Sequence, residues 1–201
     1  MITIKKRILD LSLKHSLCHI SSCLSCVEIL WDIYSKHPND VVILSNGHAG
    51  LALYCTIEHF FGINAESLLL KHGIHPCYDP ENKIYCSTGS LGCGLPIAIG
   101  YAIAGRSTHC IISDGECAEG SVWESLSFIE EHNIPIEVCV NMNGFAAYKE
   151  VNRKQLSEKL MLFYPKIKIY LTSNDPFPNT IGAHYTKMNK EEKVSYEKNI
   201  R

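Results

Sequence analysis

Two short stretches, Cys110-Ile111-Ile112-Ser113-Asp114-Gly115-Glu116 and Ile136 to Gly144, decide the expected fold of this chain of 201 residues. Each begins with an apolar, β-prone run and ends in small polar residues, which are Ser113-Asp114-Gly115-Glu116 in the first and Asn141-Met142-Asn143-Gly144 in the second. We therefore expect two β-strands whose carboxyl ends carry polar side chains. Open α/β sheets bind their ligands at that edge.

The polar residues at these strand ends favour a magnesium-bound diphosphate as the ligand. Asp114 and Asn143 offer hard oxygen ligands of the kind that Mg²⁺ prefers. Gly115 lets a phosphate approach the backbone, and the helix expected after Glu119 directs its N-terminus to the same place. Taken singly, Asp114 also fits a turn or helix cap, and Asn143 an Asn-Gly turn.

The rest of the chain predicts an α/β fold with an open, mostly parallel sheet and helices on both faces. Apolar periodicity indicates helices over about residues 3–16, 25–36, 49–61, 65–72, 95–104, 120–132 and 153–163, and strands over about 40–44, 110–113, 136–141 and 166–172. This alternation of strand and helix is typical of parallel sheets. We expect one domain over residues 1–201, with a charged tail from Lys190 that forms a solvated helix or a frayed end.

Composition excludes several classes of function. Hydrophobic residues make up 46% of the chain and charged residues 20%, which is ordinary for a soluble globular protein. A formal net charge of -2 gives no electrostatic basis for binding nucleic acid. Residues 1–14 have helical spacing instead of the continuous apolar core of a signal peptide, so we expect a cytoplasmic protein that does not bind a membrane.

The ten cysteines are expected to be reduced and mostly buried, because a fold of this size needs no disulfides. Cys23 and Cys26 form the only CxxC pair, and no second pair follows at metal-ligand spacing. His19, four residues earlier, leaves a zinc or redox site open as the alternative to packing.

A long loop is expected over residues 73–89, where Pro76, Pro80 and Asn82 interrupt regular structure. Long loops in compact domains are usually functional. The glycine-rich stretch at residues 87–94 is not a GxGxxG motif, so it favours close backbone approach to a flat ligand over a dinucleotide site. A tight turn into a buried helix is the simpler alternative.

Several ordered segments together resemble the thiamine-diphosphate-binding (PP) domain of transketolases. They are Leu44-Ser45-Asn46-Gly47-His48-Ala49, His75-Pro76, Ser87-Thr88-Gly89-Ser90-Leu91-Gly92-Cys93-Gly94, Asp114-Gly115-Glu116, Glu119-Gly120-Ser121-Val122-Trp123-Glu124 and Asn143. The resemblance covers about residues 17–143 and implies a PP-type fold. It also implies thiamine diphosphate and Mg²⁺ as cofactors.

The resemblance implies a role for each matching residue. Mg²⁺ would be held by Asp114, Asn143 and the backbone carbonyl of Phe145. The cofactor would be bound by His48, Gly89, Ser90, Leu91, Gly115, Glu116 and Asn143. The catalytic residues would be His19, His48, His75, His184 and Glu119. Imidazoles can hold phosphate or sugar oxygens and move protons near neutral pH, whereas Glu119 would lie at a subunit interface.

Simpler interpretations of these residues remain. Each histidine could be a hydrogen-bonded structural residue, and Glu119 could be an exposed acid favoured at a helix N-terminus.

The chain departs from the family pattern in a few places. Ser113 replaces a usual glycine, Asn141 a common aspartate and Cys93 a usual glutamine. The first change is expected to tighten the turn, and the others to alter the surroundings of the metal site more than the site itself. After Asn143 the chain resembles a PP domain shortened at its C-terminal end, as though one strand and one helix before the last strand were missing.

The resemblance also implies a partner. In transketolases a glutamate of a second, pyrimidine-binding (Pyr) domain activates the cofactor, and the length of this chain leaves no room for that domain. We expect the N-terminal subunit of a split transketolase-like enzyme of carbohydrate metabolism, in an α2β2 heterotetramer with a Pyr-domain subunit. The expected reaction transfers a two-carbon ketol unit between sugars or sugar phosphates.

Three alternatives remain for the function. The first is another thiamine-diphosphate enzyme that forms or cleaves ketols, and the second is a non-catalytic PP-like structural or regulatory subunit. The third is a plain nucleotide-binding α/β domain, which the absence of both Walker A and GxGxxG patterns disfavours.

Overall fold

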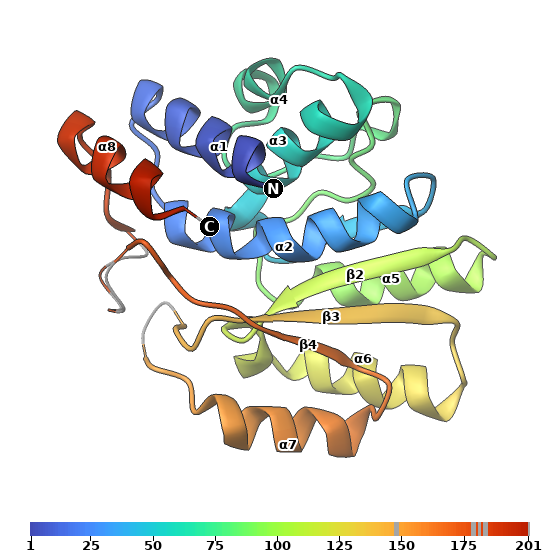
Figure 1. Cartoon of the computed structure of the whole chain (residues 1–201). Coiled ribbons are helices and arrows are strands. Elements are labelled where there is room, and N and C mark those ends of the chain that lie inside the picture. The colour runs from blue at the N-terminus through green and yellow to red at the C-terminus, as the bar shows by residue number, and fades with distance from the viewer. Residues whose placement is uncertain (147–148, 178–179, 181, 183–184, 201) are drawn as a thin grey trace.

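The computed structural model describes residues 1–146, 149–177, 180, 182 and 185–200 and contains a four-stranded parallel sheet in the order β1-β2-β3-β4 (Figure 1). The strands are β1 (Val41–Leu44), β2 (Thr108–Ser113), β3 (Ile136–Met142) and β4 (Lys168–Leu171). Every neighbouring pair is parallel. The carboxyl ends of all four strands therefore lie at one edge of the sheet.

Helices cover both faces of this sheet, as the sequence predicts. They are α1 (Ile2–Lys14), α2 (Ile20–Lys36), α3 (Gly50–Phe61), α4 (Ala65–His72), α5 (Gly94–Ile103), α6 (Gly120–Glu131), α7 (Arg153–Phe163) and α8 (Lys190–Asn199). In Figure 1 the sheet lies between α2 on one side and α6 and α7 on the other. The α/β fold class is confirmed.

Alternating strand residues divide the core into two layers, because successive side chains point to opposite faces. Val42, Leu44 and Ile111 pack with the apolar residues of α1 to α4. Ile43 and Cys110 pack with those of α5, α6 and α7. Every residue of β1 and β2 is buried, as expected for parallel strands that are covered on both faces.

Most predicted elements lie within a few residues of their expected positions. Residues 153–163 are helical as predicted, and Asn64 caps α4 by accepting the N–H of Ser67 at 2.9 Å. No helix among the described residues combines the length and apolarity needed to cross a lipid bilayer.

The predicted start of the second helix at Ser25 is wrong, because α2 begins at Ile20 with His19 as its N-cap. The serines of this segment, which resemble a loop in the sequence, are buried within the helix, and Ser25 Oγ donates to the carbonyl of Ser22 at 3.1 Å. A helical serine can return its hydroxyl to its own backbone, so a serine-rich sequence does not require a helix end.

Strand β2 begins two residues earlier than predicted because Thr108 and His109 are buried polar members of the strand. His109 is compatible with burial because both of its ring nitrogens face carboxylates, those of Asp40 and Glu137.

Helix α5 packs against the end of β1 through Gly94. The amide of Gly94 donates to Ser45 Oγ at 3.2 Å, and a Cβ at position 94 would lie 2.6 Å from Ser45 Oγ and 2.7 Å from Ser45 Cα. Gly100, in the same helix, has no heavy atom within 4 Å of the corresponding point.

We expect Gly94→Ala to lower the free energy of unfolding by about 2 kcal/mol, since the backbone of Ser45 must shift. Gly100→Ala should raise it by up to about 1 kcal/mol, because alanine favours a helix interior over glycine. Urea unfolding of both variants checks this pair of effects. Equal stability of the two variants would contradict the close packing at Gly94.

Candidate functional site

A cavity of about 230 Å³ opens at the carboxyl edge of the sheet. Side chains from the ends of β1, β2 and β3 line it, among them Asn46, Ser113, Asp114, Asn141 and Asn143. This is the position at which parallel α/β sheets bind ligands. The cavity also brings together the two stretches from which the fold was predicted.

Asp114 lies almost fully buried in the cavity wall, directly after β2. Its Oδ1 accepts the N–H of Gly115 at 3.0 Å, and its Oδ2 accepts the N–H of Gly144 at 2.6 Å. Burial raises the pKa of Asp114 to about 6, although these N–H donors favour the carboxylate. A divalent cation beside it would stabilise the ionised form.

Asn143 and Phe145 lie beside Asp114 on a tight turn after β3. Asn143 Oδ1 accepts the N–H of Phe145 at 2.9 Å, and the N–H of Val151 returns to the carbonyl of Gly144 at 2.8 Å. Gly144 has φ of 91°, which glycine adopts without strain and other residues rarely do. Asp114, Asn143 and Phe145 all line the cavity.

Glu116 is fully buried and joins three separate segments. Its Oε1 accepts Ser45 Oγ at 2.6 Å and the N–H of Gly92 at 2.9 Å, and its Oε2 accepts the N–H of Ser113 at 3.0 Å. Burial raises the pKa of Glu116 despite these donors. Glu116 is not among the residues that line the cavity, and its hydrogen bonds connect the segments behind it.

Two of the departures from the family pattern, Ser113 and Asn141, line the cavity and stabilise its wall. Ser113 Oγ accepts the N–H of Glu116 at 3.2 Å, which tightens the turn after β2. Asn141 donates to Ser25 Oγ at 2.9 Å and accepts Thr172 Oγ1 at 2.6 Å. Asn141 therefore ties β3 to α2 and to the segment after β4.

Most of the cysteines are buried packing residues. All ten lie in the described part of the chain as free thiols, and seven are buried. Cys26 Sγ accepts the amides of Asn46 at 3.3 Å and Asn141 at 3.1 Å, and burial raises its pKa to about 12. A thiol that stays protonated is a poor metal ligand, so the structure favours packing over a zinc or redox site at Cys23 and Cys26.

Three of the four predicted histidines line the same cavity as Asp114: His19, His48 and His75. The ring centroids of His19 and His48 are 5.3 Å apart. His75 comes from the long loop before α5, and its ring packs beside Gly89, where an added Cβ would lie 3.3 Å from it. His184 lies outside the described residues.

Comparison with known proteins finds relatives of this chain. No family model matches the chain. It is 33% identical over 145 residues to transketolase-like protein 2 of Mus musculus, a match that covers 61% of this chain and 23% of the relative. It is 36% identical over 147 residues to transketolase of Homo sapiens, with the same shares of 61% and 23%.

This chain is a homologue of transketolases.

A transketolase relative of another kind comes from Actinobacillus succinogenes and is named as one subunit of an apulose-4-phosphate transketolase. It is 30% identical over 146 residues, and the match covers 61% of this chain and 53% of the relative. The matched part of this chain thus corresponds to about a quarter of the length of transketolase-like protein 2 and about half of the length of the Actinobacillus succinogenes subunit.

Solved transketolases share the fold of this chain. Transketolase of Leishmania mexicana superposes with a TM-score of 0.72 over 97% of this chain and 40% of its own, at 16% identity. The enzyme of Campylobacter jejuni gives a TM-score of 0.67 over 98% and 42%, also at 16% identity. The PP-type fold is thus confirmed.

Of the remaining residues implied by the transketolase resemblance, some line the cavity and others lie outside it. Leu91 lines it, whereas Ser90 is exposed and is not part of its wall. Glu119 is exposed as the N-cap of α6 and makes no capping hydrogen bond, and its side chain packs against Gly92. In this chain by itself Glu119 therefore lies outside the cavity.

The transketolase resemblance gave no role to some residues that the structure places in the cavity, including Asn46, Ser22 and Tyr185. Asn46 Oδ1 is buried and has no hydrogen-bond partner within the described part of the chain. Asn46 belongs to the Leu44–Ala49 segment that carries the resemblance. Its position two residues before His48 could have identified it as a cavity residue from the sequence. Tyr185 packs against His19, with ring centroids 5.7 Å apart.

Proposed function

We propose that this chain is a single PP-type domain that binds Mg²⁺ and thiamine diphosphate in the cytoplasm. It acts as one subunit of an enzyme that transfers a two-carbon ketol unit between sugars or sugar phosphates. The observation that carries the proposal is the joint position of Asp114, Asn143 and three histidines around one cavity. Either the potential metal ligands or the three histidines alone would support this function less strongly than the two groups do together.

The residues present fit a magnesium diphosphate. Asp114 supplies a carboxylate, Asn143 an amide oxygen and Phe145 a backbone carbonyl, all of which are hard oxygen donors. Asp114 Oδ2 and Asn143 Oδ1 each accept one hydrogen bond within the turn, and each oxygen keeps lone-pair capacity for a cation.

Space for the diphosphate is available beside Gly115. A Cβ at this position would lie 3.5 Å from Ala146 Cα, in ordinary van der Waals contact, and would occupy part of the space beside the lining residues Gly115 and Ala146. A glycine here keeps the backbone accessible to a phosphate.

The histidines are suited to substrate chemistry. When bound, thiamine diphosphate supplies a carbanion and an electron sink. His48 and His19 lie close enough to each other to hold neighbouring oxygens of one sugar, and His75 lines the same cavity from the long loop before α5. Each imidazole can donate a hydrogen bond to a sugar oxygen or move a proton from it.

A separate Pyr-domain subunit completes the proposed enzyme as an α2β2 assembly. The Actinobacillus succinogenes relative is named as a single subunit of its transketolase, which supports a division of the enzyme between chains. Glu119 would become interfacial in that assembly.

Replacing His75 tests the proposed chemistry, because the side chain is exposed and its replacement should leave the fold intact. We expect His75→Gln to lower kcat/KM of the assembled enzyme by about 100-fold, the effect of losing one acid or base. Isothermal titration should show unchanged affinity for thiamine diphosphate. Ketol transfer from a ketose to an aldose is the activity measured.

His59→Gln is the matched control, since His59 is exposed on α3 and packs against Trp31 away from the cavity. Equal turnover of the His75 and His59 variants would remove His75 from the mechanism. Absence of ketol transfer by the complete assembly with both cofactors would overturn the proposed function.

A further inference from the structure

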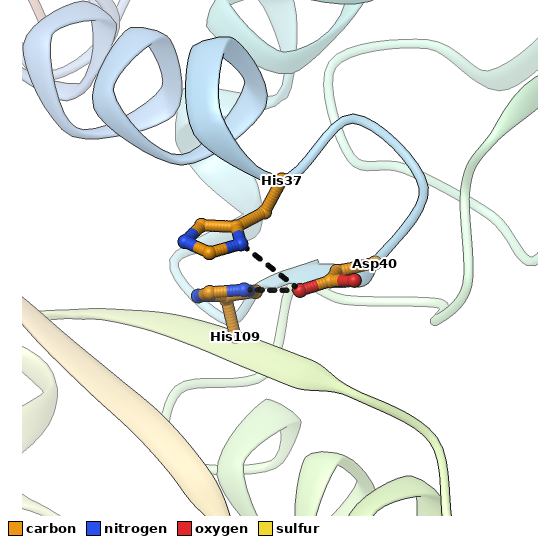
Figure 2. A group of neighbouring side chains, drawn as sticks. All are labelled: His37, Asp40 and His109. Atoms are coloured by element: carbon orange, nitrogen blue, oxygen red, sulfur yellow. Dashed lines mark hydrogen bonds and ion pairs between the residues drawn. The ribbon is translucent and has the colours of Figure 1, made fainter.

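A second group of potential ligands lies at the opposite edge of the sheet, where the strands begin. His37 is the C-cap residue of α2, Asp40 directly precedes β1, and His109 is the second residue of β2. The three side chains converge in Figure 2, where a ring nitrogen of each histidine faces one carboxylate oxygen of Asp40. Nothing in the proposed ketol transfer uses them.

The distances within this group suit a cation bound by three ligands. Asp40 Oδ2 lies 2.9 Å from His109 Nε2 and 3.6 Å from His37 Nδ1, and one ligand atom from each residue lies within 4.8 Å of the others. Ligands about 2 Å from a tetrahedral zinc ion are about 3.3 Å apart. The three atoms therefore need only small movements to share one cation.

The other nitrogen of His109 is held as it is in known metal sites. Glu137 Oε1 lies 3.2 Å from His109 Nδ1, and Lys168 pairs with the second oxygen of Glu137 at 2.5 Å. A proton on Nδ1, donated to Glu137, leaves Nε2 free to bind a cation. Metal-binding histidines commonly donate their second N–H to a carboxylate in this way.

Asp40 is also oriented from outside the group, because Ser107 Oγ donates to its Oδ2 at 2.6 Å. Exposure increases from one ligand to the next: the side chains are 6% exposed for His109, 20% for Asp40 and 48% for His37. The buried ligand is fixed by the core, and the exposed ligand gives a cation access from solvent and leaves room for a water ligand.

We propose that His37, Asp40 and His109 form a binding site for a divalent transition cation, with zinc as the best fit. Two imidazoles and one carboxylate are ligands that Zn²⁺ accepts together, whereas Mg²⁺ prefers oxygen donors alone. The bound cation joins the end of α2 to the starts of β1 and β2. This site is independent of the cavity at the carboxyl edge.

Zinc titration of the full chain after chelator treatment tests the site. We expect one zinc ion to bind wild-type protein and raise its melting temperature. His37→Gln should weaken this binding by at least about 100-fold, since it removes a direct ligand and the loss of an outer partner alone costs about 10–100-fold. Glu137→Gln should weaken it by about 10-fold.

His132→Gln is the matched control, because His132, like His37, is an exposed C-cap residue of a helix, here α6. It should bind zinc as wild-type protein does. His37 is exposed, so its replacement should leave the fold intact, and the melting temperature without metal checks this.

Cobalt(II) absorption separates this site from the exposed thiols of Cys77 and Cys93. Binding at His37 and His109 gives d–d bands without a thiolate charge-transfer band, and His37→Gln should abolish them. Zinc binding that is absent in wild-type protein, unchanged in His37→Gln, or accompanied by a thiolate band would overturn the proposal.

Discussion

Replacing Asp114 with alanine is expected to weaken the binding of thiamine diphosphate and Mg²⁺ to the assembled enzyme by at least about 100-fold. The carboxylate is the one anionic group among the three proposed metal ligands, and without the cation the diphosphate meets no compensating charge. Isothermal titration with both cofactors measures the loss.

The alanine variant also leaves the N–H groups of Gly115 and Gly144 without their partner. We expect a loss of stability of about 1–3 kcal/mol from this cause. Asp114→Asn separates the two effects, because the amide retains an acceptor oxygen but lacks the negative charge. It should fold like wild-type protein and still bind the cofactors poorly.

Asp10→Ala serves as the control, since Asp10 is an exposed acid on α1 that pairs with Lys193. Cofactor affinity that is unchanged in Asp114→Asn would remove Asp114 from the metal site.

The purified chain alone should show no measurable ketol transfer, even with Mg²⁺ and thiamine diphosphate, and a Pyr-domain subunit should restore activity. The proposed catalytic glutamate that activates the cofactor belongs to that second subunit. Exposed apolar side chains on α5 and α6, including Ile97, Ile103 and Phe128, provide a surface that a partner can cover.

Glu119→Ala should lower the activity of the assembled enzyme without altering the stability of the free chain, because Glu119 is exposed here and would be interfacial there. Glu131→Ala, at the other end of α6, is the matched control. Full turnover by the isolated chain would show that no second subunit is needed. Normal turnover of the assembled Glu119→Ala enzyme would leave the partner in place but exclude Glu119.

Local sequence patterns were sufficient for much of the fold and for the wall of the cavity. The apolar runs before Ser113 and Asn141 identify buried strands, and their parallel order brings Asp114 and Asn143 to one edge. The resemblance to transketolases identified His19, His48 and His75, because segments far apart in the chain occur in the order of the family.

What the sequence did not reveal depends on contacts between distant residues. The serines of α2 are acceptable in a helix because Ser25 meets Asn141, 116 positions away. His109 is acceptable inside β2 because Asp40 and Glu137 come from the two neighbouring strands or their ends. Neither the start of α2 nor the group formed by His37, Asp40 and His109 has a signal in local spacing.

The hydrogen bonds of Glu116 restrict the separate motion of the three chain segments at the back of the cavity. Its carboxylate receives donors from Ser45, Gly92 and Ser113, residues that lie 71, 24 and 3 positions away in the chain. Loss of the Ser113 N–H would leave Oε2 without its donor, and loss of Ser45 or Gly92 would leave Oε1 with one donor in place of two. Each loss is costly for a buried carboxyl group, which disfavours independent motion of the three segments. We therefore expect the three segments at the back of the cavity to open together as one cooperative unit, and hydrogen exchange of their amides measures this.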